Sequence, residues 1–220
     1  MTKLMIATPA QNGLVEIGYC FSFARTMDLL SRNGIHASIL MRNSGSLIVA
    51  ERNVILEAFR KSDCTHLLMI DADIEWNPDD VLRMLAHDKP IVGACYLSRG
   101  DRGFIFRTIG ESIQVNEQNL AKLSAIPAGF LLVSKGAIEC MCEKLPGLFY
   151  RSKEGEEGYG FFATMVRDGE YWGEDFSFCI HARDCGLDIW VDTAVELVHA
   201  GKRGCLLTAL NGGMDESKKS

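Results

Sequence analysis

An apolar run that ends in two carboxylates stands in the first third of the chain: His66-Leu67-Leu68-Met69-Ile70-Asp71-Ala72-Asp73-Ile74-Glu75-Trp76-Asn77-Pro78. A short apolar run bounded by polar residues is typical of a buried strand in a parallel sheet. Asp71 and Asp73 then follow the carboxyl end of that strand, where open α/β sheets bind their ligands. Two neighbouring carboxylates repel each other unless a positive group lies between them, and a divalent cation commonly fills that role. The alternative is a strand-to-helix turn in which an Asp caps the next helix, and the motif alone leaves both interpretations open.

The composition is that of an ordinary globular protein. The chain has 220 residues, of which 47% are hydrophobic and 24% charged, and this length can bury a large core. The net charge of -6, with no basic stripe, argues against a protein that grips nucleic-acid phosphates. The N-terminal apolar run is too short for a signal peptide, and no run approaches a membrane span. We therefore expect a soluble, cytoplasmic protein with no nucleic-acid partner and no transmembrane segment.

The eight cysteines are scattered along the chain, mostly within apolar stretches. No C-x-x-C pair occurs, and Cys140-Met141-Cys142 alone is not a zinc pattern. We therefore expect reduced thiols in the core rather than disulfides or a structural metal.

Strand and helix patterns alternate through the first half of the chain. Apolar runs predict strands over residues 3–8, 36–41, 67–70 and 90–96. Helical spacing of apolar residues predicts helices over residues 15–32, 47–61 and 77–86. Asn77 is the expected cap of the last helix, with Pro78 in its first turn. This alternation predicts a parallel, doubly wound α/β sheet.

The pattern changes after residue 98. Residues 100–119 predict a hairpin or loop, and residues 151–160 a mobile loop with little to bury. Residues 128–134, 187–191 and 196–199 predict strands, and residues 135–144 and 173–185 predict helices. We expect the polar tail, residues 212–220, to be disordered.

The first strand carries no G-x-G-x-x-G and the chain no P-loop, so a glycine-cradled nucleotide site is not expected. Thr8-Pro9-Ala10 ends the first strand, where backbone groups can meet a base or ribose, or where a plain proline turn stands. Arg52 lies in the predicted helix before the two carboxylates. It can pair with a diphosphate or with Asp71, or it can be an ordinary solvated arginine of that helix.

Two further candidates lie in the second half. Glu174 and Asp175 follow Trp172 at a helix start, where acids are common as caps and where a carboxylate can also act as a general base. Trp172 is a candidate for the acceptor-binding edge, although it can equally pack. His199 ends an apolar strand and becomes a candidate metal ligand if that strand end faces Asp73.

The order of these pieces carries a resemblance to a known family. The pieces are Ala50-Glu51-Arg52-Asn53, then Leu67-Leu68-Met69-Ile70-Asp71-Ala72-Asp73, then Ala128-Gly129-Phe130-Leu131-Leu132-Val133, then Gly173-Glu174-Asp175-Phe176-Ser177-Phe178, then Arg183 and His199. Over nearly its whole length the chain resembles the nucleotide-sugar-dependent glycosyltransferases of the GT-A fold, family 2-like, with a DxD motif. The resemblance implies a Rossmann-like, mostly parallel central sheet flanked by helices, with a smaller acceptor-side sheet and loop region.

The resemblance also implies one domain over residues 1–211, with a nucleotide-binding half, 1–98, and a donor-sugar and acceptor half, 99–211. It implies that Asp73 and His199 hold Mn²⁺ or Mg²⁺ against the diphosphate of a nucleotide sugar, a UDP-sugar being the expected donor. The nucleotide and donor-sugar contacts that it implies are Thr8, Pro9, Ala10, Arg52, Asp71, Ala72, Ala128 and Gly129.

The acceptor side of the implied reaction is a hydroxyl of a glycan or another molecule. Asp175 is implied as the base that deprotonates this hydroxyl, with Glu174 beside it and Trp172 at the acceptor edge. A metal neutralises the charge that builds on the leaving diphosphate, and a carboxylate on the opposite face suits attack with inversion.

Two other functions remain open from the sequence. The D-x-D strand is also similar to that of the haloacid-dehalogenase-like phosphohydrolases, in which the first Asp is a nucleophile. That family usually places the motif at its first strand and follows it with Thr or Val, whereas here it stands at the third predicted strand and Ile74 follows. A non-catalytic module that binds sugar nucleotides is the third possibility.

Overall fold

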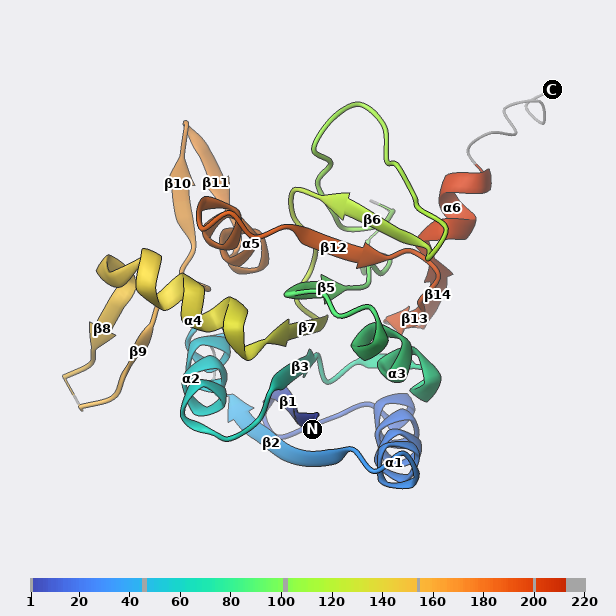
Figure 1. Cartoon of the computed structure of the whole chain (residues 1–220), viewed down its shortest axis with the longest axis horizontal. Coiled ribbons are helices and arrows are strands. Elements are labelled where there is room, and N and C mark those ends of the chain that lie inside the picture. The colour runs from blue at the N-terminus through green and yellow to red at the C-terminus, as the bar shows by residue number, and fades with distance from the viewer. Residues whose placement is uncertain (1, 45–46, 101–102, 154, 200, 213–220) are drawn as a thin grey trace.

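A seven-stranded sheet forms the centre of the computed structural model, which describes residues 2–44, 47–100, 103–153, 155–199 and 201–212 (Figure 1). From one edge to the other, its strands are β2 (His36–Ser44), β1 (Lys3–Gln11), β3 (His66–Ile70), β7 (Phe130–Ser134), β5 (Ile91–Gly93), β12 (Ile189–Asp192) and β6 (Leu120–Leu123).

The sheet is mostly parallel, as predicted. Strands β2, β1 and β3 run parallel to one another, and β5 is parallel to β12. Strand β7 lies between β3 and β5 and is antiparallel to both, and β6 is antiparallel to β12. Uniform strand–helix alternation would place β5 directly beside β3, and the insertion of β7 is the main departure from that expectation.

Helices cover both faces of this sheet (Figure 1). One face carries α1 and α3 and the other carries α2, α4 and α5. The bounds of the helices are α1 (Ile17–Arg32), α2 (Ile48–Lys61), α3 (Pro78–Ala86), α4 (Lys135–Lys144), the 3-10 turn η1 (Pro146–Leu148), α5 (Glu174–Asp184) and α6 (Leu206–Gly212). Among the described residues, no helix has both the length and the apolar character needed to cross a bilayer.

The apolar run before the two carboxylates is buried on both faces. In β3, Leu67 and Met69 pack in the core under α2, α4 and α5, whereas Leu68 and Ile70 pack in the core under α1 and α3. Side chains alternate between the two faces of a strand, so an uninterrupted apolar run requires helices on both sides. The same pattern therefore fixes the strand, its layer and the point at which Asp71 leaves it.

Three small antiparallel sheets complete the fold. Strands β14 (Lys202–Cys205), β13 (Glu196–His199) and β4 (Ile74–Trp76) form the first, and β13 pairs His199 with Ile74, directly after the D-x-D turn. The other two are the hairpins β8 (Phe149–Arg151) with β9 (Glu157–Tyr159), and β10 (Met165–Arg167) with β11 (Glu170–Trp172). The strand β13 therefore carries His199 to the neighbourhood of Asp73.

Several predicted boundaries were wrong. The first strand continues to Gln11, because Thr8 to Gln11 stay in register with β2. The predicted strand over residues 90–96 is reduced to Ile91–Gly93. The expected mobile loop over residues 151–160 is largely a hairpin, held by an edge-on contact between Phe149 and Tyr159 at 5.5 Å. Of the tail expected to be disordered, Gly212 ends α6 and the remainder lies outside the described residues.

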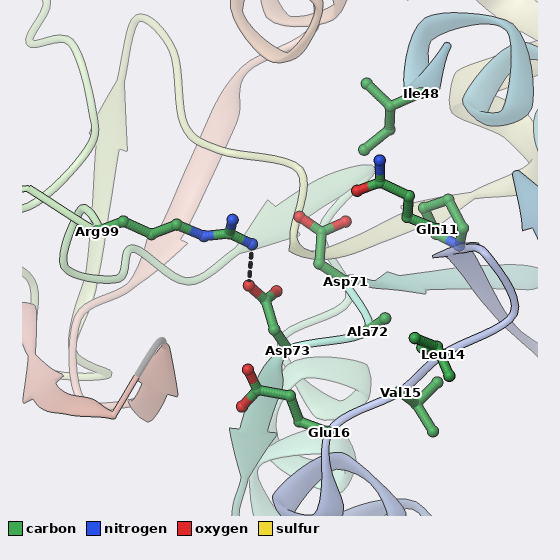
Figure 2. Close-up of a pocket in the computed structure, with 10 residues that line it drawn as sticks. Gln11, Leu14, Val15, Glu16, Ile48, Asp71, Ala72, Asp73 and Arg99 are labelled. Carbon is green, nitrogen blue, oxygen red and sulfur yellow. Dashed lines mark hydrogen bonds and ion pairs between the residues drawn. The ribbon is translucent and has the colours of Figure 1, made fainter. Parts of the chain in front are cut away.

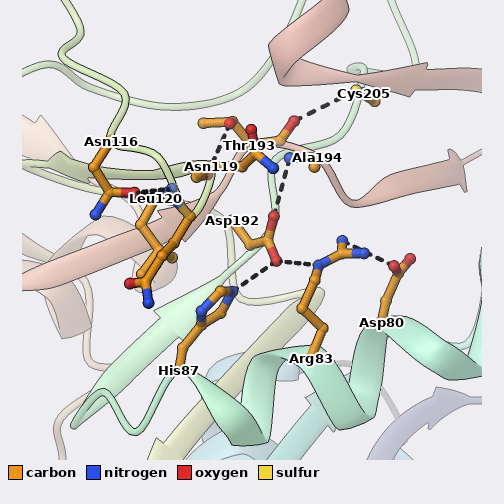
Figure 3. Close-up of polar contacts among 11 residues, drawn as sticks. Asp80, Arg83, His87, Asn116, Asn119, Leu120, Asp192, Thr193, Ala194 and Cys205 are labelled. Atoms are coloured by element: carbon orange, nitrogen blue, oxygen red, sulfur yellow. Dashed lines mark hydrogen bonds and ion pairs between the residues drawn. The ribbon is translucent and has the colours of Figure 1, made fainter.

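A buried carboxylate ties α3 to the end of β12 (Figure 3). Asp192, whose side chain is fully buried, accepts hydrogen bonds from Arg83 Nε at 2.7 Å and from the Ala194 backbone N–H at 3.0 Å, and its Oδ2 lies 3.0 Å from His87 Nε2. Arg83 also pairs with Asp80 at 2.9 Å. This network stabilises the packing of α3 on the sheet, at a place separate from the two carboxylates of the D-x-D turn.

Candidate functional site

A pocket of about 280 Å³ opens at the carboxyl ends of β1 and β3, against the start of α1 (Figure 2). Its lining residues come from β1, the loop before α1, the D-x-D turn, the start of α2 and the loop after β5: Pro9, Gln11, Leu14, Val15, Glu16, Ile48, Asp71, Ala72, Asp73 and Arg99. The Glu16 N–H donates to the Ala72 carbonyl at 2.8 Å, which fixes the turn to the start of α1. The pocket lies where parallel α/β sheets place their ligand sites.

Asp71 is held by a buried arginine. Arg52 lies in α2 and is 1% exposed, and its Nη2 donates to both carboxylate oxygens of Asp71 at 3.0 and 3.2 Å. Burial raises the pKa of Asp71, with Arg52 opposing that rise and the nearby Asp175 and Asp73 adding to it. Arg52 thus binds Asp71, one of the two partners proposed from the sequence.

The same guanidinium joins Asp71 to two other predicted site residues. Arg52 Nη1 donates to the Ala128 carbonyl at 3.1 Å, and Nη2 lies 3.6 Å from Asp175 Oδ1. The guanidinium also lies over the ring of Phe162, 5.7 Å from its centre. Arg52 therefore connects α2, the start of β7 and the start of α5, three segments far apart in sequence.

Asn53, the next residue of the Arg-Asn pair, holds the aromatic support of this arginine. Its Oδ1 accepts from the Phe162 backbone N–H at 2.9 Å. The ring of Phe162 stacks on Phe178 of α5 with centres 4.7 Å apart. Asn53 therefore fixes a side chain that packs against both Arg52 and the helix that carries Asp175.

Asp175 sits at the start of α5 with an unsatisfied oxygen. Its Oδ1 is buried and accepts no hydrogen bond in the described part of the chain. Burial raises its pKa to about 6; Arg52 opposes this rise and the neighbouring Glu174 adds to it. A carboxylate with a pKa near neutrality is suited to take and release a proton.

Gly129 allows Asp71 and Tyr96 to approach each other. A Cβ at Gly129 would lie 2.7 Å from Asp71 Oδ2 and in hard contact with the Tyr96 hydroxyl. The Gly129 carbonyl also accepts from the Asp71 N–H at 2.9 Å. The ring of Tyr96 lies 4.7 Å from that of His199. The buried Tyr96 thus lies near Asp71, beside Gly129, and near His199, which faces Asp73.

Asp73 carries two cationic or protonatable neighbours on one oxygen. Arg99 Nη2 forms an ion pair with Asp73 Oδ2 (Figure 2). His199 Nε2 lies 3.4 Å from the same atom. Burial raises the pKa of Asp73, but the contacts with His199 and Arg99 outweigh it and lower this pKa to about 2. Asp73 is therefore an anion at any physiological pH.

The chemistry of Asp73 and His199 fits a hard divalent cation. His199 Nδ1 lies 2.7 Å from the Leu97 carbonyl, which can only accept, so Nδ1 carries the proton and Nε2 faces Asp73. The pKa of His199 is raised, because a protonated Nε2 pairs with the Asp73 carboxylate. A divalent cation between the two side chains would take the place of that proton, with Nε2 and the carboxylate as its ligands. Within the described ranges, no third His, Cys, Asp or Glu completes a metal cluster. Sites for Mg²⁺ often have only one or two protein carboxylates and complete their shell with phosphate and water oxygens.

The other predicted contacts are placed unequally. Pro9 and Ala72 line the pocket, whereas Thr8 is buried with its hydroxyl 2.6 Å from that of Tyr19, and Ala10 is buried in β1. Trp172 in β11 lines a different pocket, together with Arg167, Glu170 and Arg183 among others. The structure therefore does not bring Thr8, Ala10 or Trp172 to the pocket of the D-x-D turn.

Tyr96 and Arg99 are the residues that sequence reasoning missed. Tyr96 ends the predicted strand over residues 90–96 and Arg99 follows it, at the same sheet edge as the D-x-D turn. A search for polar residues at the carboxyl end of every predicted strand would have found them. Asn53 belongs to the Arg-Asn pair of the sequence, but its bond to the Phe162 N–H depends on a contact between distant segments.

No protein-family model matches the sequence, and no curated protein matches it. Solved structures do resemble this one. A197 from STIV has a TM-score of 0.54 at 16% identity, over 90% of this chain and 85% of that one. TarS 1-349 from S. aureus, solved in complex with UDP, has a TM-score of 0.44 at 15% identity, over 86% of this chain and 57% of that one. The inositol-1-phosphate CTP transferase from T. maritima has a TM-score of 0.44 at 11% identity, over 100% of this chain and 98% of that one. At these identities the likeness to A197 concerns the fold alone, a Rossmann-like α/β sheet with small accessory sheets.

Proposed function

We propose that this protein is a metal-dependent glycosyltransferase that moves a sugar from a nucleoside-diphosphate sugar, a UDP-sugar in the first instance, to an acceptor hydroxyl with inversion. The observation that carries the proposal is the network around Arg52. One buried guanidinium joins Asp71, the Ala128 carbonyl and Asp175, so the D-x-D turn, the start of β7 and the start of α5 meet at one point. If the D-x-D turn served only to cap a helix, Asp71 would need no buried arginine that also lies beside a second carboxylate, Asp175.

The donor would occupy the pocket lined by Pro9, Leu14 and Ile48, with its diphosphate toward Asp73. The apolar wall suits a planar base, and the Gln11 amide beside it offers a donor and an acceptor. The sugar would lie toward Asp71, whose close approach to Tyr96 depends on the missing side chain at Gly129.

Asp73 and His199 would hold Mn²⁺ or Mg²⁺ at the diphosphate. When bound, this cation supplies positive charge against the leaving nucleoside diphosphate. Asp73 is suited to the role because it stays ionised, and His199 because the Leu97 carbonyl fixes its ring with Nε2 toward Asp73.

Asp175 would take the proton of the acceptor hydroxyl. Its pKa of about 6 keeps it mostly deprotonated at neutral pH while it remains basic enough to receive a proton. Arg52, 3.6 Å from Asp175 Oδ1, stabilises the carboxylate form and orients it. The transfer rate should therefore fall as the pH drops below about 6, because Asp175 is then protonated.

Calorimetric titration of UDP, with and without Mn²⁺, tests the donor site. We expect Mn²⁺ to strengthen UDP binding in the wild type and to have no effect in Asp73→Asn. The control is Asp63→Asn, which removes a carboxylate that is 77% exposed and pairs with Lys3 at the far end of β1. Equal Mn²⁺ enhancement in Asp73→Asn and the wild type would reject the metal assignment.

Hydrolysis and transfer from a panel of UDP-sugars test the chemistry. Asp175→Asn should keep UDP affinity and lose roughly 10²- to 10⁴-fold in rate, the usual range for a general base. Near-normal turnover would remove Asp175 from that role. Donor binding without any turnover would favour a non-catalytic module, and hydrolysis of simple phosphomonoesters would favour a phosphohydrolase.

A further inference from the structure

Arg99 has an unusual position for an exposed residue. Its side chain is 73% exposed, yet it reaches into the pocket and pairs with Asp73 Oδ2 (Figure 2). The same oxygen faces His199 Nε2. Among the described residues that line this pocket, Arg99 is the one basic side chain, against the acids Glu16, Asp71 and Asp73. A dianionic ligand therefore meets a wall whose positive charge is concentrated in Arg99.

The backbone around Arg99 is anchored while its guanidinium is not enclosed. Lys202 of β14 donates through Nζ to the Arg99 carbonyl at 3.2 Å and to the Gly100 carbonyl at 2.8 Å. On the other side, the Leu97 carbonyl is bound to His199 at 2.7 Å. The guanidinium can therefore turn about its side-chain bonds without any movement of the main chain.

Arg52 is unable to take over the role of binding a diphosphate. It is buried, and it is already engaged with both oxygens of Asp71 and with the Ala128 carbonyl. Arg99, in contrast, is 73% exposed and pairs with an Asp73 side chain that is 16% exposed, so the arginine side of this pair is open to solvent and can exchange more easily than a buried pair.

We propose that Arg99 is an exchangeable counter-ion: it neutralises Asp73 when the site is empty, and turns to the diphosphate of the donor when a divalent cation reaches Asp73. The inference rests on the proposed function. A cation at Asp73 Oδ2 repels the guanidinium from that oxygen, and the planar fork of Arg99 then pairs with phosphate oxygens. Arg99 thus competes with the free metal but assists the bound nucleotide.

Opposite effects on two titrations test this exchange. In a calorimetric titration with Mn²⁺ alone, Arg99→Ala should bind the metal about 2- to 5-fold more tightly than the wild type, because an exposed competing ion pair is gone. In a titration with UDP at saturating Mn²⁺, the same variant should bind roughly 10-fold more weakly, because a charge-assisted hydrogen bond to phosphate is lost. Arg99→Lys should fall between the two proteins in both titrations, since it keeps the charge and loses the fork.

The matched control is Arg203→Ala. Arg203 is 60% exposed and pairs with Glu75 and Glu196, outside the pocket. It should change neither titration. If Mn²⁺ binding depends on Asp73 but Arg99→Ala leaves it unchanged or weakens it, the exchange is overturned and the proposed function stands. Unchanged UDP affinity in Arg99→Ala would have the same consequence. A wild type without any Asp73-dependent Mn²⁺ binding would overturn both.

Discussion

Replacement of Arg52 by Met should destabilise the protein strongly, and more at high pH than at low pH. Arg52 is 1% exposed and is the cation between Asp71 and Asp175. Removal of one partner from a buried charge network costs about 3–5 kcal/mol, because the remaining charges stay buried and unpaired. In a domain of this size each kcal/mol lowers the melting temperature by roughly 2–4 °C, so a decrease of roughly 6–20 °C is expected.

The pH dependence follows from the two carboxylates that Arg52 leaves behind. Arg52 opposes the effect of burial on the pKa of both Asp71 and Asp175, so its loss raises both pKa values further above their unfolded value of 3.8. A carboxyl group whose folded pKa is raised contributes full stability below the unfolded pKa and loses it as the pH rises through the folded pKa. Each unit of additional rise therefore adds about 1.4 kcal/mol to the penalty at pH 8, and less at pH 5.

Urea unfolding at pH 5 and pH 8 measures both effects. The control is Arg60→Met in the same helix, which removes an arginine that is 36% exposed and pairs with Glu57 at 2.7 Å; it should cost less than about 1 kcal/mol. The reasoning is refuted if Arg52→Met costs no more than this control, or if its cost is the same at the two pH values.

Two other substitutions test the surroundings of the site. Gly129→Ala should cost about 1–3 kcal/mol in thermal unfolding and weaken UDP binding, because the new Cβ overlaps the Tyr96 hydroxyl; Gly136→Ala, with no atom within 4 Å of the new Cβ, should be neutral or slightly stabilising. Asp192→Asn should cost about 3 kcal/mol in urea unfolding, because it removes one of the two buried carboxylates that pair with Arg83. It should leave UDP affinity unchanged, and a loss of affinity would contradict the separation of the two networks.

Local patterns predicted much of this fold because they report local physics. The apolar run of β3 requires burial on both faces, and the Asn77-Pro78 pair does begin a helix, with Asn77 Oδ1 accepting from the Asp79 N–H at 3.2 Å. Short strands such as β4 and β14 escaped prediction because three or four residues carry no measurable period. The pairing of β4 with β13, which places His199 beside the D-x-D turn, joins segments more than a hundred residues apart.

The candidate site was predictable to the same extent. Residue types indicated Asp71 and Asp73 at a strand end and Asp175 at a helix start, but no pattern states which side chain neutralises which. The position of β7 between β3 and β5 brings Gly129 against Asp71, and that neighbour relation is not written in the periodicity of either strand. Thr8, which was predicted to line the nucleotide pocket, does not line it for a similar reason: in β1 its hydroxyl points toward Tyr19.

The two acids of the D-x-D turn differ in what balances their charge. Asp71 is bound on both oxygens by a buried arginine that the fold itself holds in place, so its partner does not leave. Asp73 is bound by an exposed arginine and faced by a histidine whose ring is fixed from behind, so its partner can be replaced. One residue of separation thus gives one carboxylate a buried, fixed ion pair and the other an ion pair open to solvent. On the proposed exchange, a ligand that brings its own cation would displace only the second, so donor binding would leave the network around Asp175 in place.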